Sequence, residues 1–392
     1  MILALRMLVF AAVVLGVLLG LHRYFWMRLA RDPSWPLGVQ RGAAVLLFLL
    51  FFAMVLTLVV SRTAGRDAAK PLAWAAFTWM GVAFFLAAVF AVTDFFRAVL
   101  PAPIDNARRT FFARLIAGAA GVVALGAAAK GAANVRSPVG VVHVPVLLPR
   151  LRGARVWRIV QITDVHVGPT IGAEYLSSVV DRVNAQSPDV VVITGDLVDG
   201  SVASLAAHVA PLRRLVAPHG VFFVTGNHEY YSGAAEWCAH LATLNIRVLR
   251  NESLAVGGDD GFTLAGVDDW TAHQFARAAP GHGHDLTSAL RFADPDRPVV
   301  LLAHQPKSVK EAALLGVDLQ LSGHTHGGQM FPFMFLVRLQ QPFVAGLSQV
   351  NDRTQIYVSR GTGYWGPPMR LGAPAEITVL TLAARGTPTG NA

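Results

Sequence analysis

The sequence of 392 residues contains one cysteine, Cys238, and few charged residues. One cysteine excludes an intramolecular disulfide and a zinc site built from several thiolates. Charged residues make up only 15% of the chain, whereas hydrophobic residues make up 54%. Soluble proteins usually carry more charge, so part of this chain is expected to lie in a membrane.

Charge is scarcest in the first third of the chain, where long apolar runs occur. Residues 42–60 and 71–93 contain no charged residue, and each run is long enough to cross about 30 Å of hydrocarbon. A shorter apolar run precedes them, and a run rich in glycine and alanine follows. We therefore predict a transmembrane region over residues 1–135, with spans near 3–22, 42–60, 71–93 and 112–130.

The distribution of basic residues bears on nucleic-acid binding and on topology. Residues 1–140 carry 14 Lys+Arg against 4 Asp, while residues 141–392 carry 19 Lys+Arg against 20 acidic residues. The second part therefore lacks the positive field that would attract a nucleic acid, and none is expected as a partner. Eight arginines lie in the loops after the first and third spans, against four positive charges in the N-terminus and second loop. In a bacterial inner membrane, this bias predicts a multi-pass protein whose residues 141–392 are extracytoplasmic.

Residues 107–133 contain a second signal that concerns topology. Arg108 and Arg109 precede two phenylalanines and a weakly hydrophobic run of small residues. This segment resembles a twin-arginine export signal, and the alternative is a charged cytoplasmic anchor for the fourth helix. Both interpretations place the two arginines in the cytoplasm.

After residue 140 the pattern changes to short apolar strands alternating with helix-like stretches, which indicates an α/β domain. We predict a linker and first strand over 136–149, the domain over 150–383 and a flexible tail over 384–392. Predicted strands include 157–163, 190–194, 221–225, 262–267, 299–303, 317–322 and 355–359.

Polar residues follow five of these strands, in the segments "TDVHVG", "GDLVDG", "GNHEYY", "AHQP" and "GHTHGG". Side chains at strand ends converge on one edge of a sheet, where open α/β folds build their sites. Seven oxygen and nitrogen donors suit two divalent cations if one carboxylate bridges them. Mn, Fe and Zn are all compatible with such a mixed set. The candidate ligands are Asp164, His166, Asp196, Asn227, His304, His324 and His326.

The order D-x-H, GD-x-x-D, GNH-E, an isolated histidine and GH-x-H resembles the calcineurin-like metallophosphoesterases. The resemblance covers about residues 150–383, and the segment "YVSRGTGYWGPPMRLGAPAEITVLTL" is similar to the membrane-associated bacterial branch. It implies a four-layer α/β/β/α sandwich with a dimetal site at the strand ends. One ion would take Asp164, His166, Asp196 and His326, and the other Asp196, Asn227, His304 and His324.

Hydrolysis of a phosphate ester also requires stabilisation of the leaving alkoxide. His228, beside Asn227, is the candidate proton donor, and Asp199 would orient its imidazole, as an equivalent Asp and His do in the family. The alternative for Asp199 is a turn or cap residue.

The expected function is that of a membrane-anchored dimetal phosphoesterase. It would hydrolyse a phosphoester or pyrophosphate bond by a metal-bridged hydroxide, on a lipid-linked or envelope substrate. One alternative is a UDP-diacylglucosamine-type pyrophosphatase with a cytoplasmic site, and another is a non-catalytic ligand-binding domain on a transporter or sensor. The apolar run at 330–347 is expected to pack in the core or, alternatively, to form an exposed lip that meets a bilayer or an acyl chain.

Overall fold

The computed structural model describes residues 2–63, 66–99 and 105–384. Apart from Ala384, the tail predicted at 384–392 lies outside the described residues. The chain divides into two compact units, Met1–Ala132 with Gly366–Met369 and Ala133–Trp365 with Arg370–Ala392. Each unit is described separately.

The first unit is built from four long helices, α1 (Ile2–Trp26), α2 (Leu37–Thr63), α3 (Arg66–Val99) and α4 (Asn106–Arg136). Each contains a stretch that is long and apolar enough to cross a membrane. The four helices predicted from the apolar runs are therefore found. They extend beyond the predicted spans because helix geometry continues through flanking polar residues, which an apolar run does not report.

Polar side chains of the first unit pair with one another. The guanidinium of Arg28 and the hydroxyl of Tyr24 both contact the Asp94 carboxylate, each at 2.5 Å. The indole nitrogen of Trp79 donates to His22 at 2.9 Å. Such pairing is how ionisable and polar groups are tolerated in a membrane region.

The second unit contains two six-stranded sheets. The first has the order β1 (Gly140–Leu147), β12 (Glu376–Ala383), β2 (Trp157–Ile162), β3 (Val190–Ile193), β4 (Val221–Phe223) and β5 (Arg247–Val248). The second has the order β10 (Gly346–Gln349), β11 (Gln355–Val358), β9 (Leu319–Ser322), β8 (Val299–Leu302), β7 (Phe262–Gly266) and β6 (Glu252–Val256). The strands predicted from the sequence are all present.

Alternate residues of the central strands enter different cores, as the two-residue period of a strand requires. In β3, Val190 and Val192 lie in the core between the two sheets, whereas Val191 and Ile193 lie in the core beneath the helices. In β8, Val300 and Leu302 lie between the sheets, and Leu301 packs with α9 and α10. The layers therefore follow the order helix, sheet, sheet, helix, as the family resemblance implied.

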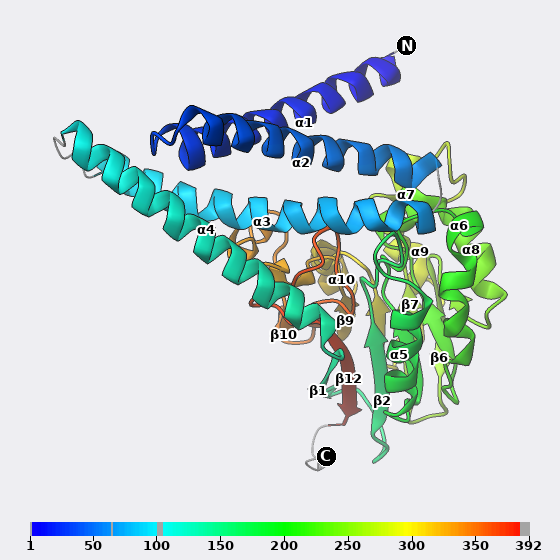
Figure 1. The fold of residues 1–392 in the computed structure, drawn as a ribbon. Helices are drawn as coiled ribbons and strands as arrows, with labels where there is room; N and C mark the ends of the chain where they lie inside the picture. The colour runs from blue at the N-terminus through cyan, green and yellow to red at the C-terminus, as the bar shows by residue number, and fades with distance from the viewer. Residues whose placement is uncertain (1, 64–65, 100–104, 385–392) are drawn as a thin grey trace. The chain divides into compact units, whose positions relative to one another are not determined.

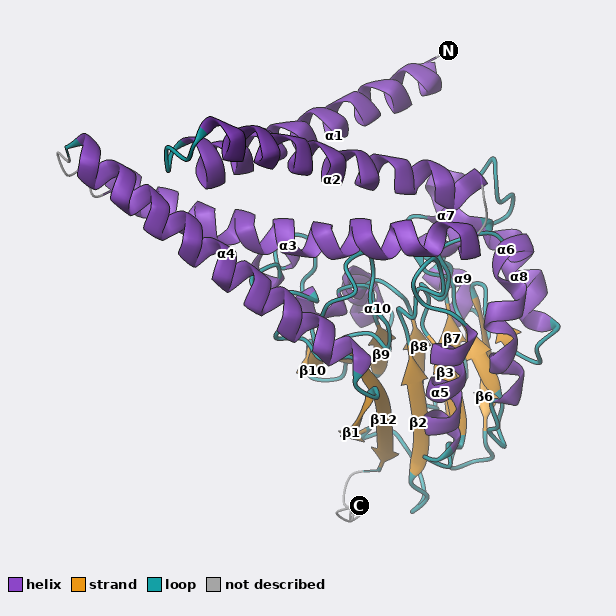
Figure 2. Cartoon of the chain, in the orientation of Figure 1, coloured by secondary structure: helices purple, strands orange, loops and turns teal. Residues whose placement is uncertain are grey.

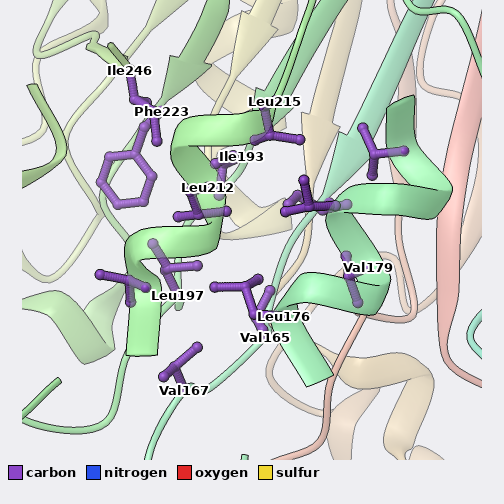
Figure 3. Close-up of a cluster of buried hydrophobic side chains, with 14 of the residues drawn as sticks. Val165, Val167, Leu176, Val179, Ile193, Leu197, Leu212, Leu215, Phe223 and Ile246 are labelled. Atoms are coloured by element: carbon purple, nitrogen blue, oxygen red, sulfur yellow. The ribbon is translucent and has the colours of Figure 1, made fainter. Parts of the chain in front are cut away.

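Short helices cover both outer faces of this sandwich. Figure 1 shows α5 and α8 beside the first sheet, and Figure 3 shows part of the core there, in which Leu176 and Val179 of α5 share a cluster with Ile193 of β3. The helices of the second unit are α5 (Ala173–Asn184), α6 (Val202–Val209), α7 (Asn227–Ser232), α8 (Ala234–Ala242), α9 (Leu286–Leu290), α10 (Val309–Leu314) and α11 (Met334–Val337).

Parallel pairing brings the ends of several strands to one edge of the sandwich. Strands β2, β3 and β4 are parallel neighbours in the first sheet, and β8 and β9 are parallel neighbours in the second. Figure 2 shows loops gathered beyond the arrowheads of β2 and β8. The five segments with candidate ligands directly follow these five strands, so they meet at that edge.

The core-packing interpretation of residues 330–347 is wrong for much of the segment. From Phe331 to Gln340 no residue is buried, and α11 within it buries none of its side chains. An apolar run without a helical or strand period can lie on a surface as well as in a core, and the sequence pattern does not distinguish the two.

Candidate functional site

Tight backbone turns at the strand ends orient the candidate ligands toward one another. Five of the seven predicted ligands have a positive φ between 50° and 70°, a conformation that is uncommon for residues other than glycine. Strained residues of this kind cluster at functional sites, where the surrounding structure holds them. The five are Asp164, His166, Asp196, His324 and His326.

Glycines next to these residues allow the loops to approach one another. A Cβ atom on Gly226 would overlap Asp196 Oδ1, and a Cβ atom on Gly323 would overlap Asp164 Oδ2. The small residues around the paired histidines are therefore required by the close approach of neighbouring loops.

The first group of candidate ligands consists of Asp164, His166 and His326, all buried. The Nε2 atoms of the two imidazoles lie 3.0 Å apart, and Asp164 Oδ1 lies 3.4 Å from His326 Nε2. Two nitrogen atoms and a carboxylate oxygen thus converge on one point. A cation can satisfy all three lone pairs at once.

The second group consists of Asp196, His304 and His324. His304 Nε2 lies 3.1 Å from Asp196 Oδ2 and 3.3 Å from His324 Nδ1. The other ring nitrogen of His304 donates to the Thr194 carbonyl at 2.8 Å, so Nε2 is the nitrogen that faces the group.

Asn227 lies beside His228, whose backbone N–H donates to Asp196, and it supplies an independent sign that a cation fits the site. Its amide oxygen is buried and has no hydrogen-bond donor among the residues that the structure describes. An unsatisfied buried acceptor usually costs about 1–3 kcal/mol, and a metal ion is one group that would satisfy it.

Asp196 belongs to the second group and also forms a candidate group with His166 and His228. Its Oδ2 is 3.1 Å from His304 Nε2 and 4.0 Å from both His166 Nε2 and His228 Nε2. Its Oδ1 accepts from the backbone N–H of His228 at 2.9 Å. This position suits a carboxylate that bridges two ions.

Asp199 contacts two imidazoles. It lies 2.5 Å from His228 Nδ1 and 3.2 Å from His166 Nδ1. The structure thus brings Asp199 and His228 together, as predicted, and adds a contact to a candidate ligand that the sequence did not suggest. A carboxylate on Nδ1 fixes the ring orientation and leaves Nε2 free to bind a metal.

The pKa values of several side chains in the site are shifted from their ordinary values. Burial opposes ionisation of Asp196, but His304 and His228 outweigh it and hold the pKa of its carboxyl well below the usual range. Burial, together with the charge of Asp196, raises the pKa of Asp164 against the opposing effect of His304. For His304, Asp196 outweighs the effect of burial and raises the imidazole pKa well above its usual value. A proton on His304 facing Asp196 occupies the place that a cation would take, so metal binding there would release it.

His228 and the candidate ligand His324 have pKa values shifted in opposite directions. Burial lowers its pKa, but Asp196 and Asp199 outweigh this and raise the pKa to about 9. Burial and the charge of His304 lower the pKa of His324 to about 3, which keeps that imidazole neutral. Neutral imidazoles bind metals, whereas a protonated imidazole can donate a proton.

Two residues of the site have roles that the sequence did not suggest. Glu229 is fully buried, and its carboxylate accepts from the backbone N–H groups of Asp196, Leu197 and Gly226 at 3.0, 2.8 and 2.6 Å. It ties the loop after β3 to the loop after β4. Glu229 falls within the "GNHE" motif, but its side-chain partners are backbone groups and leave no trace in the sequence.

The second is Arg370, which is also buried. Its guanidinium lies 3.2 Å from the His326 ring and donates to the His326 backbone oxygen at 3.3 Å. The arginine follows the last candidate ligand by more than forty positions, so only the fold brings the two together.

Comparisons with known proteins agree with this geometry. The family model described as calcineurin-like phosphoesterase matches residues 158–328, which include all nine predicted site residues. The chain is 45% identical over 265 residues to a Bos taurus "transmembrane protein with metallophosphoesterase domain", covering 65% of this chain and 59% of that protein. It is 43% identical over 243 residues to an uncharacterized metallophosphoesterase of Helicobacter pylori, covering 61% and 63%.

A third relative is an uncharacterized metallophosphoesterase of Aquifex aeolicus, which is 34% identical over 230 residues. That alignment covers 58% of this chain and 86% of the relative. By contrast, the chain spans less than two thirds of the length of the Bos taurus and Helicobacter pylori proteins.

Proposed function

This chain belongs to the calcineurin-like metallophosphoesterase family, whose members are metal-dependent phosphohydrolases, and we propose that it hydrolyses a phosphoester or pyrophosphate bond with two divalent ions. One observation carries the proposal. Asp196 forms one group of candidate ligands with His304 and His324, and its Oδ2 lies 4.0 Å from His166 of the other group. In the loop after β4, the buried Asn227 amide oxygen has no donor among the described residues.

The proposed ligand assignment follows the two groups. Asp164, His166 and His326 would hold one ion, Asn227, His304 and His324 would hold the other, and Asp196 would be shared between them. Two divalent ions, when bound, neutralise phosphate oxygens and make water acidic enough to serve as a nucleophile. Mn, Fe and Zn all suit this donor set.

The remaining residues position groups and move a proton. His228 is the proposed general acid, because it is protonated at neutral pH and its Nε2 lies near the bridging carboxylate. Asp199 holds the Nδ1 side of that imidazole, so a proton on Nε2 would be available to the leaving oxygen. Glu229 keeps the loops of Asp196 and Asn227 in register.

The four apolar helices and the similarity to a transmembrane relative support membrane association. We propose that the chain lies in a bacterial inner membrane, that its catalytic domain is extracytoplasmic and that its substrate is lipid-linked or part of the envelope. The charge bias of the loops supports this orientation. A cytoplasmic domain would instead favour a pyrophosphatase of the UDP-diacylglucosamine type.

The test of hydrolysis uses the full chain in detergent, depleted of metal and then reloaded with Mn, Fe or Zn. Bis-p-nitrophenyl phosphate, p-nitrophenyl phosphate and a lipid pyrophosphate separate diester, monoester and pyrophosphate preferences. We expect metal-dependent hydrolysis of at least one class. Absence of hydrolysis of all three with every metal would favour the non-catalytic alternative.

The test of orientation uses reporters fused after Ala392. A periplasm-active phosphatase reporter should be active there, and a reporter that fluoresces only in the cytoplasm should stay dark. The reverse result would overturn the outward orientation. Replacing Arg108 and Arg109 by lysine should reduce export only if residues 107–133 act as a twin-arginine signal.

A further inference from the structure

An exposed apolar segment directly follows the last candidate metal ligand. We call Phe331–Leu339 the apolar lip. Phe335, Leu336 and Leu339 are 56%, 57% and 80% exposed, and no residue of the lip is buried. Contiguous exposed apolar surface of this kind marks an interaction site.

The lip is held against the loop that carries His326. A Cβ atom on Gly328 would lie 2.6 Å from Met334 Cα, so α11 packs directly on the backbone of that loop. The Thr325 hydroxyl donates to the Val344 carbonyl at 2.6 Å and fastens the other side of the segment. The position of the lip is therefore fixed relative to the candidate metal site.

Cationic side chains adjoin the lip. An open groove of about 600 Å³ is lined by Lys307, Lys310 and Arg338 together with apolar Leu314 and Leu339. Leu314 is 87% exposed. Residues 319–351 contain no aspartate or glutamate, and Glu311 is the one acidic residue that lines the groove. Apolar and cationic groups thus share one surface.

We propose that this surface binds an anionic lipid bilayer, with the apolar lip inserted at the interface and Lys307, Lys310 and Arg338 on lipid phosphates. Aromatic and aliphatic side chains flanked by lysine and arginine are what an interfacial membrane contact requires.

The covalent connection of the chain favours a bilayer as the occupant. Only residues 137–139 separate α4 from β1. A connection of that length spans at most about 14 Å, so β1 begins within that distance of the end of α4, a candidate membrane helix. Because the domain is covalently tethered to a candidate membrane helix, its surface is at a high effective concentration relative to the bilayer. A small apolar surface such as the lip is then sufficient for binding.

The inference deepens the proposed function and rests on it for its consequence. If the candidate metal site hydrolyses phosphoesters, a lip seated in the interface presents that site to phosphates at headgroup depth. The substrate class would then be a membrane lipid phosphate or pyrophosphate, which could enter the site while its acyl chains stay in the bilayer.

The test measures insertion without relying on hydrolysis. The full chain carries Cys238→Ala and either Phe335→Cys or, as control, Phe292→Cys, which is an exposed phenylalanine outside the lip and groove. Each cysteine receives an environment-sensitive fluorophore, and the protein is placed in nanodiscs of phosphatidylcholine with or without phosphatidylglycerol. Phospholipids with a nitroxide near the headgroup then quench any fluorophore at the interface.

We expect quenching at position 335 to exceed that at position 292 by roughly twofold or more, with the larger effect in anionic discs. Replacing Lys307, Lys310 and Arg338 by glutamine should abolish the increment due to phosphatidylglycerol. Replacing three exposed arginines outside the groove by glutamine should leave the phosphatidylglycerol increment unchanged. These are Arg152, Arg213 and Arg247.

Equal quenching at the two positions, or an anionic increment that survives loss of the three groove cations, would overturn the inference. Hydrolysis of bis-p-nitrophenyl phosphate is measured on the same samples. A quenched but inactive protein would reject the proposed function and retain the lip as a membrane contact. An active protein without quenching at position 335 would support the proposed function and reject the lip as a membrane contact.

Discussion

Replacing Asp199 by asparagine should impair metal binding as well as proton transfer, because Asp199 contacts both His228 and His166. The carboxylate lies 2.5 Å from His228 Nδ1 and 3.2 Å from His166 Nδ1. An asparagine offers one acceptor oxygen in place of two, and its amide nitrogen cannot accept from an Nδ1–H group. Oδ1 contacts both rings, and Oδ2 also lies 3.2 Å from His166 Nδ1. Asparagine would therefore leave both imidazoles without the charge of the carboxylate and His166 without its second acceptor.

The expected size of the effect follows from the group that is lost. A hydrogen bond to a charged group contributes about 1.5–3 kcal/mol. Loss of a carboxylate behind a metal-binding histidine typically lowers metal affinity or activity by roughly 10- to 100-fold. Asp199→Asn should therefore shift the metal dependence of hydrolysis by roughly 10- to 100-fold and lower the rate at saturating metal as well.

The assay titrates Mn into the metal-depleted full chain and follows hydrolysis of bis-p-nitrophenyl phosphate. His228→Ala is the informative comparison, because it removes the proposed acid and leaves the contact between Asp199 and His166. It should lower the rate without shifting the metal dependence. Asp181→Asn is the matched control, since this exposed aspartate pairs with Arg214 on the surface and should behave as wild type.

Two results would refute the reasoning. An Asp199→Asn protein with the metal dependence of wild type would show that the contact with His166 does not orient a ligand. A His228→Ala protein with the same shift as Asp199→Asn would show that His228 itself holds the metal, and the general-acid assignment would fall.

Three further predictions concern other parts of the site. Asp196→Asn should abolish hydrolysis and reduce bound metal, which elemental analysis measures, and a variant with wild-type metal content would remove the bridging role. His228→Ala should lose about 100-fold in rate with an alkyl leaving group and less with p-nitrophenolate, so an equal loss for both substrates would argue against proton donation. Gly323→Ala should lower the free energy of unfolding by about 1–3 kcal/mol, because its Cβ atom would overlap Asp164 and Thr163, whereas Gly258→Ala, which meets no atom within 4 Å, should leave the melting temperature almost unchanged.

Much of the second unit could be predicted because its signals are local. Strands such as β3 and β8 are short apolar runs, and the polar segments after them mark where each strand ends. Parallel neighbours must end at the same edge, so loops far apart in the sequence could be expected to meet. The family resemblance supplied the order of layers and the division of ligands between two ions.

The contacts that the sequence did not reveal depend on tertiary placement. Glu229 binds backbone N–H groups, which every residue carries, so no sequence pattern records its partners. Asp199 reaches His166 across a separation of 33 positions, and Arg370 reaches His326 across 44. The exposure of the apolar lip could not be predicted either, because hydrophobicity alone does not say whether a segment is buried.

The central claim is that two ions held around Asp196 carry out phosphoester hydrolysis, and the number of ions that the active protein needs tests it most directly. The metal-depleted full chain is reloaded stepwise with Mn, and bound metal and hydrolysis of bis-p-nitrophenyl phosphate are measured on the same samples. We predict about two ions per chain at full activity, with most of the rate appearing as the second site fills. Full activity with one ion per chain, or activity that survives complete metal removal, would contradict the account.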